Sequence, residues 1–111
     1  MPHKDGFKPV LSIIVPTWNQ AAMTAQCFAS VRAHTKTAYE IIWIDNGSKP
    51  EEFNVMRSQA TRPRVHTKLI KYQENVGFIK ATNAGIREAE GKYIILLNND
   101  TLVTWRWEKS Y

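Results

Sequence analysis

The chain has 111 residues and a formal net charge of +5, with 43% hydrophobic and 23% charged residues. This size and composition are typical of one globular domain and exclude a largely disordered protein. The basic excess suits an anionic ligand or an anionic membrane surface, but it is spread over short segments, so charge alone gives little support to a nucleic-acid-binding module.

Cys27 is the only cysteine, which excludes an internal disulfide and favours a reducing compartment. It lies among apolar residues at helical spacing, so a buried small side chain is favoured over a reactive thiol. No apolar run approaches the roughly 20 residues of a membrane span, and the N-terminal stretch has no signal-peptide core. We therefore expect a cytoplasmic protein.

Four apolar runs predict the strands of a parallel sheet. They cover residues 10–15, 39–44, 67–72 and 93–97, and a polar arm, residues 1–9, precedes them. The fourth run has no polar break, which is typical of a strand buried on both faces, so we expect it to be central in the sheet. Pro16 ends the first run because it has no N–H to donate to the ladder.

Three helices are predicted between these strands, at residues 20–34, 50–60 and 78–90. The apolar face of the first is expected to hold Met23, Cys27, Phe28 and Val31. The second has Pro50 in its first turn and Ser48 as its expected cap. The sheet-facing side of the third is expected to hold Ile79, Asn83, Ile86 and Ala89, with Gly91 ending the helix. Alternating strands and helices predict an α/β fold with parallel crossovers.

The loops that follow the four strands are expected to share one edge of the sheet, because parallel strands all end on the same side. These loops are the polar ones: residues 17–19, 45–48, 74–77 and 98–100. The connections at the opposite edge carry few groups suited to binding. This asymmetry is the main argument from the residues for a ligand site.

Each loop offers different chemistry. Trp18 has a flat ring on which a base could stack, worth about 1–3 kcal/mol, although a core aromatic fits the same pattern. Asp45 and Asn46 could bind a base edge or ribose, although Asp-Asn-Gly-Ser is also an ordinary turn sequence. Asn83, on the predicted inner face of its helix, needs a partner that a ligand could supply. Asp100 suits Mg²⁺ or Mn²⁺ shared with phosphate, although a lone Asp there is more often a cap or turn residue.

Other sequence patterns bear on the kind of ligand and on the class of enzyme. The segment 75–77 precedes a helix, whose first N–H groups could help to hold an anion. His3, His34 and His66 are scattered without Cys/His ligand spacing, so we expect them at the surface or at a helix end and expect no zinc site. The sequence has no Walker-type loop, no G-x-G-x-x-G and no G-x-S-x-G, which argues against those enzyme classes.

Taken together, these segments resemble the nucleotide-binding half of the inverting family 2 glycosyltransferases, whose fold is called GT-A. The matching stretches are residues 11–19 (LSIIVPTWN), 42–48 (IWIDNGS), 75–78 (NVGF), 83–86 (NAGI) and 93–101 (YIILLNNDT). Their order and spacing match across nearly the whole chain. The motifs Asp-Asn-Gly-Ser and Asn-x-Gly-Phe are most similar to those of the rhamnosyltransferase-type branch.

The resemblance implies a Rossmann-like, three-layer α/β/α domain with a mostly parallel sheet of about four strands, over residues 10–111. It implies a nucleotide pocket made of Pro16, Thr17, Trp18, Asn19, Asp45, Asn46, Asn75, Asn83 and Asn99. Asp100 would bind the Mg²⁺ or Mn²⁺ that bridges the diphosphate. The implied activity is transfer of a hexosyl or rhamnosyl group from a nucleoside-diphosphate sugar to a glycan or lipid-linked acceptor, in cell-surface polysaccharide synthesis.

The chain departs from the family pattern in three ways. Many relatives carry a second acidic residue where this chain has Asn46. Their Asp-x-Asp metal motif is Asn98-Asn99-Asp100 here, which keeps only the last carboxylate. In the family the acceptor site and catalytic base follow this motif, and the chain ends eleven residues after Asp100. The acceptor half is therefore expected to be absent, and no catalytic residue is assigned.

Two alternatives stay open. The chain could be an inactive nucleotide-binding remnant that forms homo-oligomers through an aromatic surface at Trp105, Trp107 and Tyr111. It could also be a basic nucleic-acid-binding module, which steep salt dependence of oligonucleotide binding would reveal. Peripheral association with a membrane is a further expectation, whereas nucleic acid is not an expected partner of the favoured hypothesis.

Overall fold

The computed structural model describes residues 2–110. The strands are β1 (Leu11–Thr17), β2 (Tyr39–Asn46), β3 (Thr67–Tyr72) and β4 (Tyr93–Leu96). The helices are α1 (Ala21–His34), α2 (Pro50–Ala60) and α3 (Phe78–Glu88), and a short 3-10 helix, η1 (Trp107–Ser110), follows β4. The predicted strands and helices are thus present in the predicted order.

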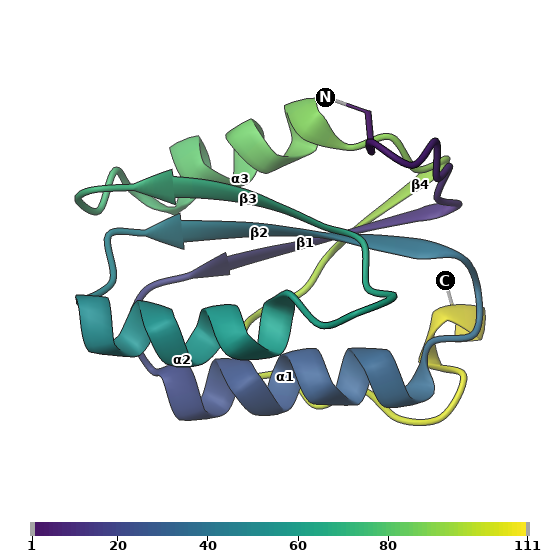
Figure 1. Ribbon diagram of the computed structural model, residues 1–111, viewed down its shortest axis with the longest axis horizontal. Helices are drawn as coiled ribbons and strands as arrows, with labels where there is room; N and C mark the ends of the chain where they lie inside the picture. Colours follow the sequence, from purple (N-terminus) through teal and green to yellow (C-terminus); the bar gives the residue numbers. More distant parts are fainter. Residues whose placement is uncertain (1, 111) are drawn as a thin grey trace.

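The four strands form one parallel sheet in the order β3-β2-β1-β4. Leu11 at the start of β1 pairs with Tyr39 of β2 on one side and with Tyr93 of β4 on the other. Helices α1 and α2 cover one face of the sheet, and α3 covers the other (Figure 1). This confirms the predicted α/β class, and the carboxyl ends of the strands meet at one edge.

The larger core lies between the sheet and the layer of α1 and α2. Trp43 of β2 is fully buried, stacks on Phe53 of α2 with ring centroids 5.1 Å apart, and meets Phe28 of α1 edge-on at 5.9 Å. Cys27 is buried in the same cluster, as predicted. Burial and the nearby negative charge of Asp100 raise the pKa of its thiol to about 11, so it stays protonated and inert at neutral pH.

The expectation that the fourth strand is central was wrong. β4 is an edge strand, and although Ile95 is buried, the side chains of Ile94 and Leu96 are about half exposed. A continuous apolar run shows that both faces can be buried, but it does not show which strand lies at the edge. The sequence therefore located this strand but not its place in the sheet.

The predicted inner face of α3 was wrong for three of its four residues, whereas the fourth, Ala89, lies just after the helix and packs against the core. The side chains that α3 buries are small: Ala81, Thr82, Ala84 and Gly85. A Cβ added at Gly85 would lie 2.6 Å from Ile44 Cδ1 and 3.0 Å from Ile14 Cγ2, so small residues let α3 lie close to the sheet. Ile79, Asn83 and Ile86 face outward instead.

Several smaller expectations also need correction. Met23 of α1 is exposed rather than packed in the core. Ser48 does not cap α2, whose N-cap position is Lys49 and has no side-chain cap bond. Helix α3 ends at Glu88, so Gly91 does not end the helix. A Cβ at Gly91 would lie 2.6 Å from the Ser12 backbone nitrogen, so a glycine here lets the chain pass close to β1.

The predicted polar arm packs against the amino edge of the sheet. His3 Nε2 lies 2.7 Å from Oε1 of the buried Glu40, and the Phe7 ring stacks on His66 at 3.6 Å. His3 is therefore not a surface residue, because a buried carboxylate holds it. His34 is the last residue of α1, as expected for a helix end.

The tail after β4 folds back along α1. Trp107 is buried, and its Nε1 donates a hydrogen bond to Thr35 Oγ1 at 2.7 Å. The proposed aromatic oligomer surface is therefore not formed as expected: of its members only Trp105 is exposed among the described residues, and Tyr111 lies outside them. No helix among the described residues is long and apolar enough to cross a membrane.

Candidate nucleotide-sugar site

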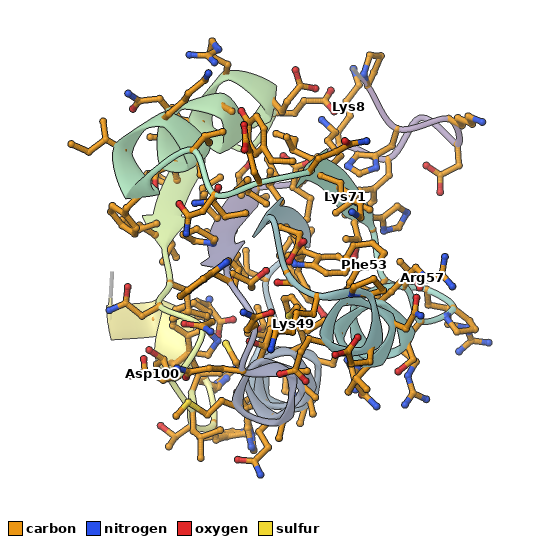
Figure 2. The ribbon with its side chains drawn as sticks, turned by 90° about the vertical axis from the view of Figure 1, so that its left-hand side faces the viewer. Lys8, Lys49, Phe53, Arg57, Lys71 and Asp100 are labelled. Atoms are coloured by element: carbon orange, nitrogen blue, oxygen red, sulfur yellow. The ribbon has the colours of Figure 1, made fainter. Side chains whose placement is uncertain are left out.

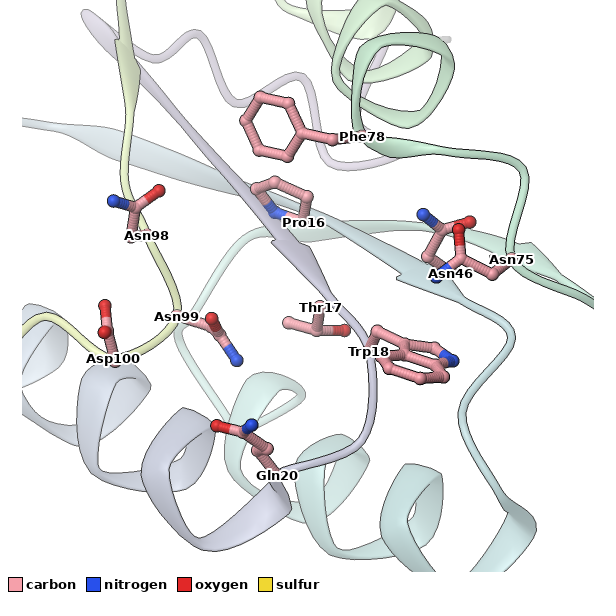
Figure 3. A pocket seen from close by; sticks show the side chains of 10 residues that line it. All are labelled: Pro16, Thr17, Trp18, Gln20, Asn46, Asn75, Phe78, Asn98, Asn99 and Asp100. Atoms are coloured by element: carbon pink, nitrogen blue, oxygen red, sulfur yellow. The ribbon is translucent and has the colours of Figure 1, made fainter.

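A pocket of about 350 Å³ opens at the carboxyl edge of the sheet, where the four loops meet (Figure 3). Its lining comes from β1 and its loop, the end of β2, the loop before α3, and the turn after β4. The lining residues are Pro16, Thr17, Trp18, Gln20, Asn46, Asn75, Phe78, Asn98, Asn99 and Asp100. The loops that the sequence predicted to share one edge thus meet at this pocket.

Asp45 anchors the floor of the site from below. It is fully buried and is the second-last residue of β2 rather than part of a loop, because β2 extends to Asn46. Its Oδ1 accepts hydrogen bonds from Thr17 Oγ1 at 3.1 Å and Ser48 Oγ at 2.5 Å, and its Oδ2 accepts one from the Ser48 N–H at 3.0 Å. Asp45 does not line the pocket, so its oxygens hold β1 and the β2–α2 loop together.

The same network fixes the loop after β1. Trp43 Nε1 donates to Thr17 Oγ1 at 2.8 Å, which sets the orientation of that hydroxyl. The Asn19 N–H donates to Ser48 Oγ at 2.7 Å, and Asn19 Oδ1 accepts from the Lys49 N–H at 2.9 Å. Asn19 is thus used to join two loops and does not line the pocket.

Asn46 joins β2 to the loop before α3. Its Oδ1 accepts the Val76 N–H at 2.8 Å, and its Nδ2 donates to the Gly77 carbonyl at 3.3 Å. Asn75 Oδ1 accepts the Gly77 N–H at 2.8 Å, which closes an Asx turn in the same loop. Gly47 has φ +87°, and a Cβ there would meet the Glu74 carbonyl carbon at 2.6 Å, so only glycine lets the two loops come this close.

Two aromatic rings border the pocket. Trp18 is 55% exposed, which rules out the alternative that it is a core aromatic. Figure 3 shows its ring at one side of the opening and the Phe78 ring above Pro16 at another. Each ring offers an apolar face of the kind on which a nucleobase stacks.

The turn after β4 supplies the one charged side chain among the described residues that line the pocket. Asn99 Nδ2 donates to Thr24 Oγ1 of α1 at 3.0 Å, and the Thr101 N–H donates to the Asn98 carbonyl at 3.1 Å. These bonds fix the turn, while the Asp100 carboxylate stays exposed at the pocket (Figure 3). Of the described residues that line the pocket, Asp100 alone is charged.

The structure brings together seven of the predicted site residues and leaves three apart. Pro16, Thr17, Trp18, Asn46, Asn75, Asn99 and Asp100 line the pocket. Asn19 and Asp45 lie beneath it, and Asn83 lies on the outer side of α3, away from it.

Three lining residues were not among the predicted ones. Gln20 lies in the left-handed region (φ 57°) just before α1, a conformation that the sequence did not signal. Phe78 is the last residue of the Asn-x-Gly-Phe motif, and Asn98 is the first residue of the Asn-Asn-Asp motif. Their position in those stretches was therefore the signal that could have found them.

The donor set at the pocket fits a hard divalent cation that is shared with a phosphate ligand. Asp100 gives one exposed carboxylate, and Asn98 and Asn99 give amide oxygens beside it. One carboxylate is too few to cage an ion, but Mg²⁺ commonly keeps one or two protein carboxylates and takes its other ligands from phosphate and water. The residues present are therefore compatible with such an ion only together with its ligand.

Known sequences are similar to most of the chain. A model of the family "Glycosyl transferase family 2" matches residues 12–108. The chain is 29% identical over 94 residues to the uncharacterized glycosyltransferase YwdF of Bacillus subtilis, covering 85% of this chain and 34% of the relative. It is 33% identical over 94 residues to an uncharacterized glycosyltransferase of Rickettsia prowazekii, covering 85% and 28%. The chain thus spans about a third of the length of these relatives.

Solved structures share the fold. A mannosyltransferase of Pyrobaculum calidifontis, PcManGT, in complex with GDP-Man and Mn²⁺, superposes with a TM-score of 0.79 at 24% identity, covering 90% of this chain and 30% of that one. Residues 1–349 of Staphylococcus aureus TarS, in complex with UDP-GlcNAc, superpose with a TM-score of 0.79 at 20% identity, covering 90% and 29%. The family model covers most of the chain and the GT-A fold is shared, so the chain belongs to glycosyl transferase family 2.

Proposed function

We propose that the chain is the donor-binding part of a glycosyltransferase and binds a nucleoside-diphosphate sugar together with Mg²⁺ or Mn²⁺. One observation carries this proposal: a single pocket joins two exposed aromatic rings, several amides and one free carboxylate across four loops. Aromatic rings suit a base, amides suit base edges and ribose hydroxyls, and a carboxylate suits a metal ion on a diphosphate.

The charge of the pocket supports the metal. A diphosphate brings negative charge, and of the described lining residues none is Lys or Arg while Asp100 adds a further negative charge. A divalent cation bound to Asp100 would turn this repulsion into attraction. When bound, such an ion stabilises negative charge on the departing diphosphate.

The residues of the chain divide into ligand contacts and supports. Trp18 and Phe78 would bracket the base, and Asn75 and Asn99 would offer amides to the ribose and diphosphate. Asn46 lines the pocket, but both ends of its amide are already bonded to the loop before α3, so it acts mainly by shaping that loop. Asp45 supports Thr17 and does not contact the ligand.

The nucleotide, the sugar and the acceptor are proposed from separate observations. The solved relatives hold GDP-Man and UDP-GlcNAc, which suggests UDP and GDP as the first nucleotides to test here. Rhamnosyl transfer is supported by the motifs Asp-Asn-Gly-Ser and Asn-x-Gly-Phe. A glycan or lipid-linked acceptor is supported by the family resemblance.

Calorimetric titration of the chain with UDP and GDP, with and without MnCl₂, tests the proposal. We expect binding that needs the metal and that Asp100→Ala weakens at least about tenfold, because the ion loses the one carboxylate that the described pocket residues offer. Glu51→Ala, an exposed carboxylate on α2, is the matched control and should bind like the unmodified chain. An absence of binding with MnCl₂ present would contradict the proposal.

A further inference from the structure

The turn that carries Asp100 has little regular structure of its own. Residues 97–104 belong to no helix or strand, and between residues 98 and 103 the structure describes one backbone–backbone hydrogen bond, from the Thr101 N–H to the Asn98 carbonyl. The Asp100 carboxylate accepts no hydrogen bond from any described residue. Because such a segment cannot hold its position by backbone pairing alone, side chains of neighbouring elements must place it.

Helix α1 supplies these side chains through two hydroxyl groups. Thr24 is fully buried, and its Oγ1 accepts a hydrogen bond from Asn99 Nδ2 at 3.0 Å. Six residues later on α1, Ser30 Oγ accepts the Val103 N–H at 3.1 Å. Asn99 immediately precedes Asp100, and Val103 follows it by three residues. The two hydroxyls therefore hold the chain on both sides of the carboxylate.

The contact between this segment and α1 is closely packed. Cys27, midway between the two hydroxyls on α1, has its Sγ 3.8 Å from the Asn98 carbonyl oxygen, but a thiol is a weak donor. Leu97 and Val103, at the two ends of the segment, are buried in the core that α1 shares with the sheet. Figure 2 shows Asp100 on the side of α1 that faces away from α2. Packing thus keeps the segment against α1, and the two hydroxyls set its register along the helix.

The hydrogen bonding of Ser30 fixes its role as an acceptor. Its Oγ donates to the Cys27 carbonyl, one turn earlier in α1, at 2.8 Å. Because a hydroxyl has a single hydrogen, only its lone pairs remain for the Val103 N–H. Ser30 is thereby held by its own helix while it holds the segment after Asp100.

Thr24 also decides which end of the Asn99 amide faces the ligand. A primary amide donates through its nitrogen and accepts through its oxygen. The nitrogen is used by Thr24, and Figure 3 shows it directed toward α1, with the oxygen directed away from this helix on the pocket side. An oxygen there can accept a hydrogen bond from a hydroxyl or contact Mg²⁺ or Mn²⁺, which favour carboxylate and carbonyl oxygens. Without Thr24 the amide would be free to turn its nitrogen to the pocket.

We propose that Thr24 and Ser30 are positioning residues for the divalent ion: they set the turn so that the Asp100 carboxylate and the Asn99 oxygen are directed at the pocket. This inference rests on the proposed function, because it concerns the ion that Asp100 would hold. Neither Thr24 nor Ser30 lines the pocket, so each acts through another residue. Removal of a group that orients a metal-binding side chain commonly weakens metal binding about 10- to 100-fold.

Calorimetric titration with UDP and GDP in the presence of MnCl₂ tests the role of Thr24. Thr24→Val keeps the shape of the side chain but loses the hydroxyl, and it should weaken nucleotide binding at least about tenfold. Thr24→Ser retains the hydroxyl and should bind like the unmodified chain. In an Asn99→Ala background, Thr24→Val should cause no further loss, because Thr24 acts through the Asn99 amide. A circular dichroism melt confirms that each variant folds.

Hydrogen exchange tests the role of Ser30. Ser30→Ala removes the acceptor of the Val103 N–H, and exchange of this amide should become about fivefold faster, the factor that corresponds to the loss of one ordinary hydrogen bond. Nucleotide binding should weaken less than in Thr24→Val, because Val103 is three residues from Asp100 whereas Asn99 is adjacent to it. Unchanged exchange of the Val103 amide would overturn the role of Ser30.

Two threonines away from the pocket give matched controls. Thr67, at the start of β3 and thus at the opposite edge of the sheet, donates through its Oγ1 to the Ala60 carbonyl at 2.6 Å. Thr67→Val should lower the melting temperature and leave nucleotide binding unchanged. Thr82 of α3 is buried, and its Oγ1 has no hydrogen-bond partner among the described residues, so Thr82→Val should change neither.

The outcomes separate this inference from the proposed function. If the unmodified chain binds nucleotide with MnCl₂ and Thr24→Val binds equally well, the inference is overturned while the proposed function stands. The same holds if Thr24→Ser loses as much affinity as Thr24→Val, or if Thr67→Val does. If the unmodified chain does not bind at all, the proposed function fails and the inference fails with it.

Discussion

The side chain of Asn46 holds the backbone of Val76, whose N–H it accepts at 2.8 Å, and thereby ties the end of β2 to the loop before α3. The amide also donates to the Gly77 carbonyl, so one side chain provides hydrogen bonds for two backbone groups of the loop. The loop that contributes Asn75 and Phe78 to the pocket is therefore positioned by a residue of a neighbouring strand.

Replacement of Asn46 should loosen this loop. We expect Asn46→Ala to lower the free energy of unfolding by about 1–3 kcal/mol, because it leaves the partly buried Val76 N–H unpaired and removes one of the two hydrogen bonds of the Gly77 carbonyl, which keeps the bond from the Ala81 N–H. Hydrogen exchange of the Val76 amide should become faster. Asn46→Asp keeps the acceptor and should retain protection of Val76. Equal exchange rates in both variants would show that the side chain does not hold the loop.

Gly47 should be irreplaceable, unlike another glycine of similar conformation. Gly47 and Gly6 both have positive φ, +87° and +77°, but a Cβ at Gly47 would meet the backbone of Glu74 at 2.6 Å, whereas one at Gly6 would meet nothing within 4 Å. We expect Gly6→Ala to cost about 1–2 kcal/mol through backbone strain alone, and Gly47→Ala to cost clearly more. Urea denaturation of the two variants measures this difference, and equal losses would contradict the close approach of the two loops.

Trp18 should contribute to ligand binding but not to stability. Its ring is more than half exposed, so Trp18→Ala is expected to leave the midpoint of thermal unfolding nearly unchanged. Loss of a stacking contact worth about 1–3 kcal/mol should weaken nucleotide binding roughly 5- to 150-fold. Calorimetry with UDP or GDP and MnCl₂ measures the affinity. A variant that unfolds early but binds normally would give Trp18 a structural role instead.

Stability should fall in acid because of Glu40. Burial of this carboxylate favours its neutral form, but hydrogen bonds from the Glu90 N–H and Ser12 Oγ, the contact with His3, and the charge of Lys68 outweigh burial and lower its pKa below the ordinary value of 4.5. The unfolded chain therefore takes up this proton at a higher pH than the folded one. The stabilisation is fully present above pH 4.5 and is lost as the pH falls through the folded-state pKa.

Glu40→Gln isolates this effect. At neutral pH the variant should lose about 1.5–3 kcal/mol of unfolding free energy, because a neutral amide replaces the charged acceptor of the hydrogen bonds from Ser12 Oγ and the Glu90 N–H, while Lys68 keeps its contact with Glu90. The difference from the unmodified chain should shrink as the pH is lowered below 4.5. Urea titrations at several pH values measure both curves, with Glu51→Gln on the exposed face of α2 as the control. A constant difference at every pH would contradict the lowered pKa.

The order and type of the elements could be predicted from the sequence because apolar residues form short continuous runs in the strands and recur at helical spacing in the helices. What failed was the direction in which elements face. The residues Ile79 and Ile86 suggested an apolar inner face for α3, but Gly85 and its small neighbours allow a closer approach to the sheet, and close packing decided the orientation. Likewise, the apolar run of β4 could not reveal that no further described strand lies beside it.

The residues that gather at the candidate site were predicted in outline, but the contacts that each one makes were not. The rule that loops after parallel strands share one edge correctly brought Trp18 and Asp100 to one pocket. The sequence Asp-Asn-Gly-Ser suggested a turn, but β2 continues through Asn46, which buries Asp45 and converts it from an expected ligand contact into a support for Thr17 and Ser48. Such a two-residue extension of the strand, from residue 44 to Asn46, has no sequence signal.

The central claim is that Asp100 holds a divalent ion at this pocket, and paramagnetic broadening by Mn²⁺ tests it most directly. In ¹H–¹⁵N spectra recorded with UDP or GDP, substoichiometric Mn²⁺ should broaden the amide signals of residues 98–101 first, and Asp100→Ala should remove this effect. The only group of three potential metal ligands among the described residues, His3, Glu40 and Glu90, lies at the opposite edge of the sheet. Broadening confined to that cluster, with residues 98–101 unaffected, would contradict the account.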